Sequence, residues 1–368
     1  MNFEINSLQD IRQTPEYARF MEMLGWQLEG IGPTYAFVKK LPLLPFSIIK
    51  ILRYHPPLSS IKLEKLAKKH HAIIVKEEPF ILDQKYTSFC HPDPPVGGEG
   101  SSPAEGVGVT GIRQRFFGSK SRPLRMTECK LCLERQINNP IYFQVSPNNQ
   151  WPLLPTKTIW TDLSQSEKNL LGRLKPKARY NLKKAVENKL TVAIIPGNKI
   201  NHGQLKEFYN LWSHNKPHNF LFKPHFTELK SLVACFGKKC FFVFIYLPCH
   251  SNPPLRRGKN LAKRNLYAPI KIGARSFSAN WRIRMTENGV AACCLILISS
   301  NMVFYWHNAS TKSGKKLFAP TLCVWEAIKE AKRRKLKVFD FEGVWDERFP
   351  DLNKGWKGFS RFKEGFTK

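Results

Sequence analysis

The sequence predicts an α/β fold made of two tandem domains with mixed sheets. The chain has 368 residues, of which 42% are apolar, enough for one or two ordinary cores. At about 100 to 200 residues per domain, this length favours two domains. Helical and strand-like patterns also recur in a similar order in each half. We therefore expect a first domain over residues 1–156 and a second over residues 157–368.

The first half begins with an amphipathic helix at residues 14–26. A Thr-Pro start precedes Tyr17, Phe20, Met21 and Leu24, which recur at helical spacing. Alternating or β-branched runs then predict strands, and a Ser start with apolar residues at 3.6-residue spacing predicts a second helix. These segments are strands at 34–38 and 47–53, a helix at 59–72 and a strand at 72–78.

Two basic, polar segments interrupt this pattern. Residues 91–111 are rich in Pro, Gly and Ser without periodicity, so we expect an unstructured insertion that extends to about residue 140. A second interruption covers about residues 249–286. Order should resume after the first one near residues 141–145.

The second half repeats the mixture of helices and strands. A strand at 158–163 precedes two helical pieces joined at Pro176, and Ser164 and Glu167 have the spacing of a capping box. The remaining segments are a strand at 191–195, helices at 201–215 and 223–236, a strand at 241–247, a hairpin at 289–299 and 301–308, a helix at 318–336 and a strand at 337–343.

The charge balance indicates a polyanionic partner. The chain has 59 Lys and Arg against 28 Asp and Glu, a formal net charge of +31. Nucleic acid, a phosphorylated substrate and an anionic membrane surface all fit this excess, and composition does not choose among them. The polar N-terminus lacks the pattern of a secretory signal, and the longest apolar stretch, residues 41–52, is too short to span a bilayer. Nine scattered Cys suggest no disulfide framework and fit a reducing cytoplasm.

The sequence lacks the motifs of several common metal sites and enzyme classes. Cys129 and Cys132 form a C-x-x-C pair, but zinc needs four ligands and no second pair follows, so we expect no metal site. A P-loop, a G-x-S-x-G turn and an H-E-x-x-H helix are also missing, which argues against nucleotide hydrolysis, serine esterase and metalloprotease activities.

Several motifs follow one another along the chain. They are QTPEYARFMEMLGW at 13–26, T-x-x-x-D-L at 158–163, K-x-R-x-N-L-x-K-A at 177–185, FYNLW at 208–212, YWHNAS at 305–310, VFDFEG at 338–343 and GFSRFKEGF at 358–366. In their order and spacing, these motifs resemble the Fem family of peptidoglycan-bridge aminoacyltransferases. The resemblance implies two acetyltransferase-like domains and transfer of an amino acid from aminoacyl-tRNA to an amine of the stem peptide of a cell-wall precursor. That precursor is either UDP-linked or lipid-linked, and the reaction uses no metal or organic cofactor.

The same resemblance assigns roles to five residues. Lys223 stands where the family carries a cation for the precursor's phosphates, and Tyr305 and His307 lie on a strand that lines the precursor channel. With a period of two, Tyr305 and His307 should share one face of that strand. Phe362 and Lys363 match a Phe-Lys pair at the transfer point, where a fixed cation stabilises the oxyanion of aminoacyl transfer.

Further residues are weaker candidates. Glu78, just before Pro79, stands where the family shows an acidic residue and could accept a proton from the attacking amine. Asp340 should orient backbone amides or a neighbouring lysine. Arg179 and Lys183 share one helix face and are candidate contacts for tRNA or a membrane, although the ordinary interpretation, a solvated helix face, is slightly favoured.

We therefore expect a cytoplasmic aminoacyltransferase that forms interpeptide bridges during cell-wall synthesis. Its partners would be aminoacyl-tRNA and a muramyl-peptide precursor, with peripheral contact to the inner membrane face left open and no DNA partner. Two alternatives stay open. One is an acyl-CoA-dependent N-acyltransferase of the same fold class, and the other is a non-catalytic basic protein that binds RNA or the cell envelope.

Overall fold

A computed structural model of the chain describes residues 8–83, 140–145, 151–215, 224–248 and 289–367. The predicted insertions, about 91–140 and 249–286, lie outside the described residues apart from residue 140, and so does Lys223. Among the described residues, no helix combines the length and apolar character needed to cross a bilayer.

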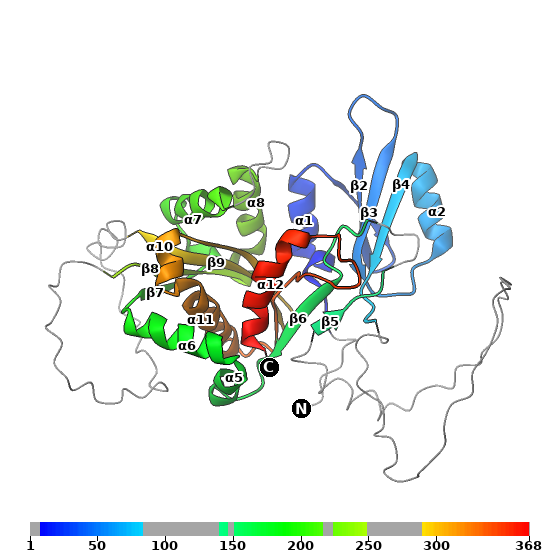
Figure 1. The fold of residues 1–368 in the computed structure, drawn as a ribbon. Helices are drawn as coiled ribbons and strands as arrows, with labels where there is room; N and C mark the ends of the chain where they lie inside the picture. Colours follow the sequence, from blue (N-terminus) through cyan, green and yellow to red (C-terminus); the bar gives the residue numbers. More distant parts are fainter. Residues whose placement is uncertain (1–7, 84–139, 146–150, 216–223, 249–288, 368) are drawn as a thin grey trace, which may run out of the picture.

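The first half forms a four-stranded mixed sheet in the order β1-β2-β3-β4 (Figure 1). The first three strands are antiparallel neighbours, and β4 runs parallel to β3 after the crossover helix α2. Leu66 of α2 belongs to the apolar cluster that contains Ile49 and Ile51 of β3. The elements are β1 (Gln27–Ile31), β2 (Thr34–Lys40), β3 (Ser47–Tyr54), α2 (Ser60–Lys69) and β4 (Ala72–Pro79).

Helix α1 (Pro15–Met23) connects the two halves of the chain. Thr14 caps it by accepting a hydrogen bond from the backbone N–H of Tyr17, as the Thr-Pro start predicts. The helix packs against α8 (Phe226–Phe236). Its buried Tyr17 and Met21 join the apolar cluster of the second sheet, so both halves contribute to one core.

The second half forms a seven-stranded mixed sheet in the order β5-β6-β11-β10-β9-β8-β7. Only the β10–β11 pair is parallel among these neighbours. The strands are β5 (Pro140–Tyr142), β6 (Lys157–Asp162), β7 (Thr191–Pro196), β8 (Cys240–Tyr246), β9 (Val290–Ser299), β10 (Met302–Ser310) and β11 (Val338–Asp340).

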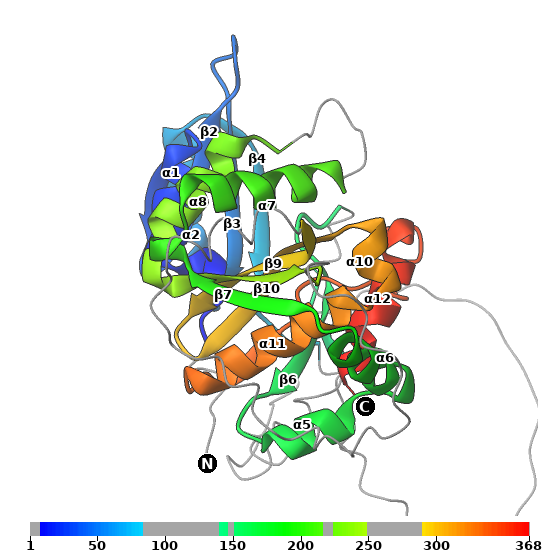
Figure 2. The same ribbon diagram turned by 90° about the vertical axis from the view of Figure 1, so that its left-hand side faces the viewer.

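Helices cover both faces of the second sheet, as Figure 2 shows. One face packs against α7 and α8 and the other against α5, α6 and α11, so two separate apolar clusters form. These helices and the shorter ones near the C-terminus are α5 (Glu167–Arg173), α6 (Pro176–Glu187), α7 (His202–His214), α10 (Lys312–Lys316), α11 (Ala319–Arg333) and α12 (Lys357–Lys363). Single 3-10 turns are η2 (Ile11–Gln13), η3 (Gly197–Lys199), η5 (Gly237–Lys239), η6 (Lys354–Trp356) and η7 (Glu364–Phe366).

Some local expectations differ from the structure. Helix α5 starts at Glu167, and its N-cap is Ser166, which accepts from the backbone N–H of Asn169. The predicted cap at Ser164 is therefore wrong by two residues. Strand β1 was not expected because its sequence, QLEGI, mixes polar residues and a glycine. The short helices α10 and α12 were not expected either, because their sequences lack a strong apolar repeat.

The two sheets meet through short contacts. An isolated bridge joins Leu82, just after β4, to Phe143, just after β5. Strand β5 lies before the predicted boundary between residues 156 and 157, yet it pairs with β6 of the second sheet. The boundary itself stays a prediction.

The aromatic core under α7 should dominate stability. Phe208 of α7 is fully buried and contacts Phe242 edge-to-face at 5.0 Å between ring centroids. We expect Phe208→Ala to lower the free energy of unfolding by about 3–5 kcal/mol, because it removes apolar burial and leaves a cavity. Urea denaturation measures this change. Tyr180→Ala on the exposed side of α6 is the control, and an equal loss in both variants would contradict the assignment.

Candidate functional site

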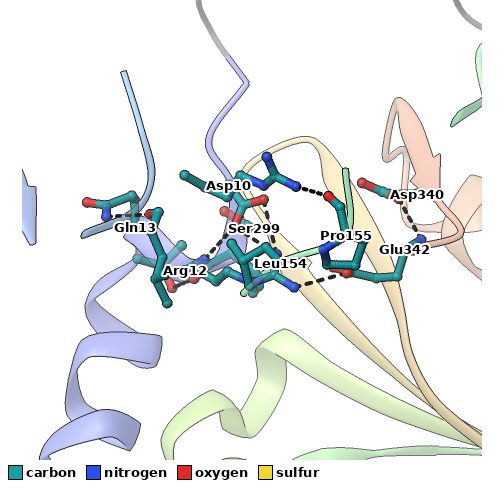
Figure 3. A network of polar contacts seen from close by, with 12 residues as sticks. Asp10, Arg12, Gln13, Leu154, Pro155, Ser299, Asp340 and Glu342 are labelled. Carbon is teal, nitrogen blue, oxygen red and sulfur yellow. Dashed lines mark hydrogen bonds and ion pairs between the residues drawn. The ribbon is translucent and has the colours of Figure 1, made fainter. Parts of the chain in front are cut away.

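A buried polar cluster lies where residues 10–13 meet the C-terminal end of β11 (Figure 3). Arg12 of η2 forms ion pairs with Asp10 at 3.1 Å and with Glu342 at 2.9 Å. Its guanidinium also lies 5.0 Å from the ring centre of Trp306. Burial alone would lower the pKa of Arg12, but the charges of Glu342 and Asp10 raise it above its usual value. Arg12 is therefore a fixed cation.

Gln13 attaches this turn to the first sheet. Its side-chain amide donates to the carbonyl of Leu52 at 2.7 Å and accepts from the backbone N–H of Tyr35 at 2.9 Å. The turn thus contacts β2 and β3 through Gln13 and the end of β11 through Arg12. A shift between the two sheets would disturb both sets of contacts.

Glu342 adopts an unusual backbone conformation. Its φ is +59°, in the left-handed region that residues with a Cβ seldom occupy. One carboxylate oxygen, Oε2, accepts from Arg12, whereas Oε1 is buried and has no hydrogen-bond partner among the residues that the structure describes. Backbone strain together with an unsatisfied buried oxygen is typical of functional positions.

Asp340 fixes the turn that carries Glu342. Its carboxylate accepts from the backbone N–H of Glu342 at 2.6 Å, from the indole N–H of Trp160 at 3.0 Å and from the hydroxyl of Thr158. Burial, and then the negative charge of Glu342, raises the pKa of Asp340 to about 7. The expectation that Asp340 orients a backbone amide is confirmed.

Lys363, at the C-terminal end of α12, lies next to the same turn. Its side chain is nearly inaccessible, and its ammonium donates to the carbonyl of Gly343 at 2.8 Å. Phe359 and Tyr305 lie beside it, with ring centres 4.7 Å and 6.0 Å from Nζ. Burial lowers the pKa of Lys363 to about 8, although the charges of Glu342 and Asp340 oppose the shift. Both protonation states are therefore accessible near neutral pH.

Gly343 allows this close packing. A Cβ at this position would lie 2.5 Å from Pro155 and 2.6 Å from Trp356. The glycine that ends the VFDFEG motif is thus required by space rather than by chain flexibility. Phe362 precedes Lys363 in α12, and its ring centre lies 5.4 Å from that of Phe366.

Tyr305 and His307 do not share a face of β10, so the period-of-two expectation is wrong. Tyr305 pairs with Ile296 and His307 with Leu295, which leaves Trp306 as an extra residue. Tyr305 is buried in the cluster under α11, where burial raises the pKa of its hydroxyl well above the usual value. His307 stacks on Trp212 of α7, across the sheet, at 4.1 Å.

Glu78 binds the backbone of the segment that precedes β6. Its two carboxylate oxygens accept from the backbone N–H groups of Leu153 and, at 2.9 Å, Leu154. It thereby holds the segment that leads into β6. Nearby Arg53 donates to the carbonyl of Pro155, and both side chains line one small pocket. With both oxygens engaged, Glu78 is poorly placed to accept a proton, and its role as a base stays a prediction.

The other predicted residues lie elsewhere. Arg179 and Lys183 are exposed on α6, where Arg179 donates to the carbonyl of Gly172 at 2.8 Å. Their contact with tRNA stays a prediction, as does the phosphate contact of Lys223, which lies outside the described residues. Within the described ranges, no cluster of three or more His, Cys, Asp or Glu could hold a metal, and Cys129 and Cys132 lie outside them.

The contacts of Arg12, Arg53 and Glu342 could not be predicted from the sequence. Arg12 and Glu342 are 330 positions apart, and neither lies in a periodic pattern. The available signal was the VFDFEG string itself, which places two acidic residues at the end of a buried strand.

The described residues form an α/β protein with two mixed sheets, and the buried polar cluster lies where the two sheets meet. A sequence model of the FemAB family matches residues 281–368, a range that includes Tyr305, Asp340, Glu342 and Lys363. The resemblance to the Fem family is thereby confirmed. None of the curated proteins matches the chain by sequence.

The chain is also similar in fold to solved structures. The chain is similar to the crystal structure of FemX, with a TM-score of 0.59 and 12% identity over 98% of this chain and 89% of that one. It also matches the C-terminal domain of a putative lysylphosphatidylglycerol synthetase from Agrobacterium fabrum, with a TM-score of 0.47 and 9% identity over 97% and 86% of the two chains. The likeness to FemX confirms the predicted fold class.

The lowered pKa of Lys363 predicts a pH-dependent stability. Between about pH 8 and 10.5, the unfolded chain binds more protons at this lysine than the folded chain, so stability rises with pH. Lys363→Met removes this effect. We expect the unfolding free energy of the wild type to gain about 3 kcal/mol relative to the variant across that range, as measured by urea denaturation at each pH. The exposed Lys316→Met is the control, and parallel pH curves for wild type and Lys363→Met would refute the burial effect.

Proposed function

We propose that the chain is an aminoacyltransferase that moves an amino acid from aminoacyl-tRNA to an amine on the stem peptide of a peptidoglycan precursor. The observation that carries the proposal is the buried Lys363 beside Asp340 and Glu342, in the part of the chain that matches the FemAB family. In this role the protein acts in the cytoplasm and forms interpeptide bridges of the cell wall.

The reaction needs positioning and charge stabilisation more than strong acid–base chemistry. The acceptor amine attacks the ester carbonyl of aminoacyl-tRNA and forms a tetrahedral oxyanion. Collapse breaks the ester C–O bond, the ribose oxygen takes up the proton that the amine has lost and leaves as a hydroxyl, and an amide remains. Because the ester is already activated, alignment of the two substrates supplies much of the rate. The ammonium of Lys363 is the proposed oxyanion partner, with Phe362 shaping the space beside it.

The attacking amine must also lose a proton. Glu78 is bound to two backbone amides, whereas one carboxylate oxygen of Glu342 has no partner within the described part of the chain, and Glu342 lies one residue from the carbonyl that binds Lys363. Glu342 is therefore the stronger candidate for the proton acceptor. Since Lys363 is only 5% exposed, this proposal requires α12 and the turn at Gly343 to shift when the substrates enter.

The charge of the chain supports the choice of partners. A tRNA and a diphosphate-linked precursor are both polyanions, and a net charge of +31 favours the approach of both. Lys223, Tyr305 and His307 remain proposed contacts for the precursor, UDP-linked or lipid-linked, and Arg179 and Lys183 remain proposed contacts for tRNA. The bulge at Trp306 means that Tyr305 and His307 would approach the precursor from different faces of the sheet. DNA, metals and organic cofactors have no part in the proposal.

An acyl-CoA-dependent N-acyltransferase is the second candidate, because the acetyltransferase-like fold suits either donor. Purified protein would be incubated with a mixture of charged tRNAs and UDP-linked or lipid-linked muramyl pentapeptide. Mass spectrometry of the acceptor then reports the added residue. RNase treatment should abolish the transfer. Transfer from acyl-CoA in RNase-treated reactions would favour the second candidate, and no transfer from either donor would favour a binding protein without catalysis.

Lys363 should control the rate rather than substrate affinity. We expect Lys363→Met to lower kcat by about 10²–10³, because one preorganised oxyanion donor is commonly worth that factor. The wild-type rate should fall above about pH 8 as the ammonium loses its proton, and Lys363→Arg should keep part of the rate and lose this decline. Steady-state kinetics across pH measure both effects. The exposed Lys316→Met should match the wild type, and an unchanged kcat in Lys363→Met would exclude the assigned role.

A further inference from the structure

The loop between β2 and β3 exposes large apolar side chains at its tip. Leu43 is fully exposed, and the exposed fractions of Leu44 and Phe46 are 54% and 41%. Figures 1 and 2 show this hairpin rising beyond the helices and strands around it. A single exposed leucine is ordinary, whereas three large apolar side chains within four residues of a projecting loop indicate a binding surface.

The topology places more apolar surface at the same end of the sheet. Strands β3 and β4 are parallel, with Ser47 opposite Ala72, so both strands start beside the hairpin tip. The carbonyl of His71 accepts from the backbone N–H of Ser47, which fixes this arrangement. Ile73 and Ile74, at the start of β4, are each more than half exposed. We call residues 40–46 and 68–74 together the hairpin end.

Cations surround this apolar tip. Lys40 is exposed at the end of β2, and Lys68 and Lys69 are exposed at the C-terminus of α2. The hairpin end contains no Asp or Glu. Glu64 pairs with Lys68 and Glu29 pairs with Lys69, so neighbouring carboxylates neutralise part of the charge. The hairpin end therefore combines a projecting apolar loop with positively charged side chains beside it.

The shape and chemistry favour a lipid surface over a protein or an RNA. A projecting tip needs a partner that deforms around it, and lipids do so without a matching groove. Phosphates of RNA would satisfy the lysines and leave the leucines in water. At an anionic bilayer, apolar side chains enter the interface while lysines stay among the headgroups.

We propose that the hairpin end seats the protein on an anionic membrane surface, with Leu43, Leu44 and Phe46 inserted at the interface. This attachment goes beyond the proposed transfer reaction and does not depend on it. It would bring the protein to the surface that carries lipid-linked acceptors. Binding should be reversible and sensitive to salt, because few apolar side chains insert and the lysine contribution is screened.

Vesicle flotation tests the proposal without any activity assay. The full chain would be mixed with vesicles of phosphatidylglycerol and phosphatidylcholine, and separately with phosphatidylcholine alone. We expect binding to the anionic vesicles, a loss of at least about tenfold in the triple variant L43S/L44S/F46S, and a loss of about fivefold in Lys40→Ser, since each lysine near such a surface contributes about this factor. Circular dichroism and thermal melting would verify that the variants fold.

Matched controls distinguish insertion of the hairpin tip from nonspecific binding to vesicles. Ile61→Ser alters an exposed isoleucine at the first turn of α2, away from the hairpin end, and should bind as the wild type does. A tryptophan introduced by Leu44→Trp should shift its emission to the blue with anionic vesicles, which reports insertion directly. Failure of the wild type to bind anionic vesicles, or equal binding by the triple variant, would overturn the proposal.

Other occupants would give different results. If the triple variant converts a dimer into a monomer in sedimentation while vesicle binding persists, the tip is a contact between two copies and the proposal is wrong. If it weakens tRNA binding in a gel shift while vesicle binding persists, the tip contacts RNA and the proposal is equally wrong. Loss of vesicle binding with transfer to a UDP-linked acceptor intact would support the membrane role and leave the transfer reaction standing.

Discussion

The ion pair between Arg12 and Glu342 is the interaction on which the candidate site depends. It joins side chains 330 positions apart and connects η2 to the end of β11. A buried ion pair gives little net stability, because desolvation offsets most of the attraction, but the loss of one partner leaves an uncompensated charge. Asp10 and the ring of Trp306 complete the surroundings of Arg12. The pair therefore fixes how the two sheets meet more than how stably each one folds.

The same low-polarity setting explains the behaviour of Lys363 and Asp340. Burial disfavours charge on both, so the pKa of the lysine falls and that of the carboxylate rises. Each group ends closer to neutrality than it would be in water. A cation kept in such surroundings interacts strongly with any negative charge that develops nearby. The strained backbone at Glu342 is a further feature that is typical of functional sites.

Much of the fold could be predicted because the signals are local. The Thr-Pro start of α1, the apolar repeats of α2 and α11 and the buried runs of β8 and β9 each report on their own neighbourhood. The candidate site depends on contacts that local patterns do not contain. One extra residue at Trp306 was enough to move His307 to the other face from Tyr305. Lys363 and Asp340 could be found from motifs, whereas Arg12 became visible only through its distant partner.

The position of β11 also orders the assembly of the second sheet. This strand of three residues, Val338–Asp340, lies between β6 and β10 and hydrogen-bonds to both. During synthesis, β5 and β6 emerge early and β7 to β10 later, yet the two groups have no shared ladder until β11 leaves the ribosome. The sheet thus stays in two pieces, each with an open edge, for most of translation. Closure of the sheet and arrival of Asp340 and Glu342 at the site are consequently one event.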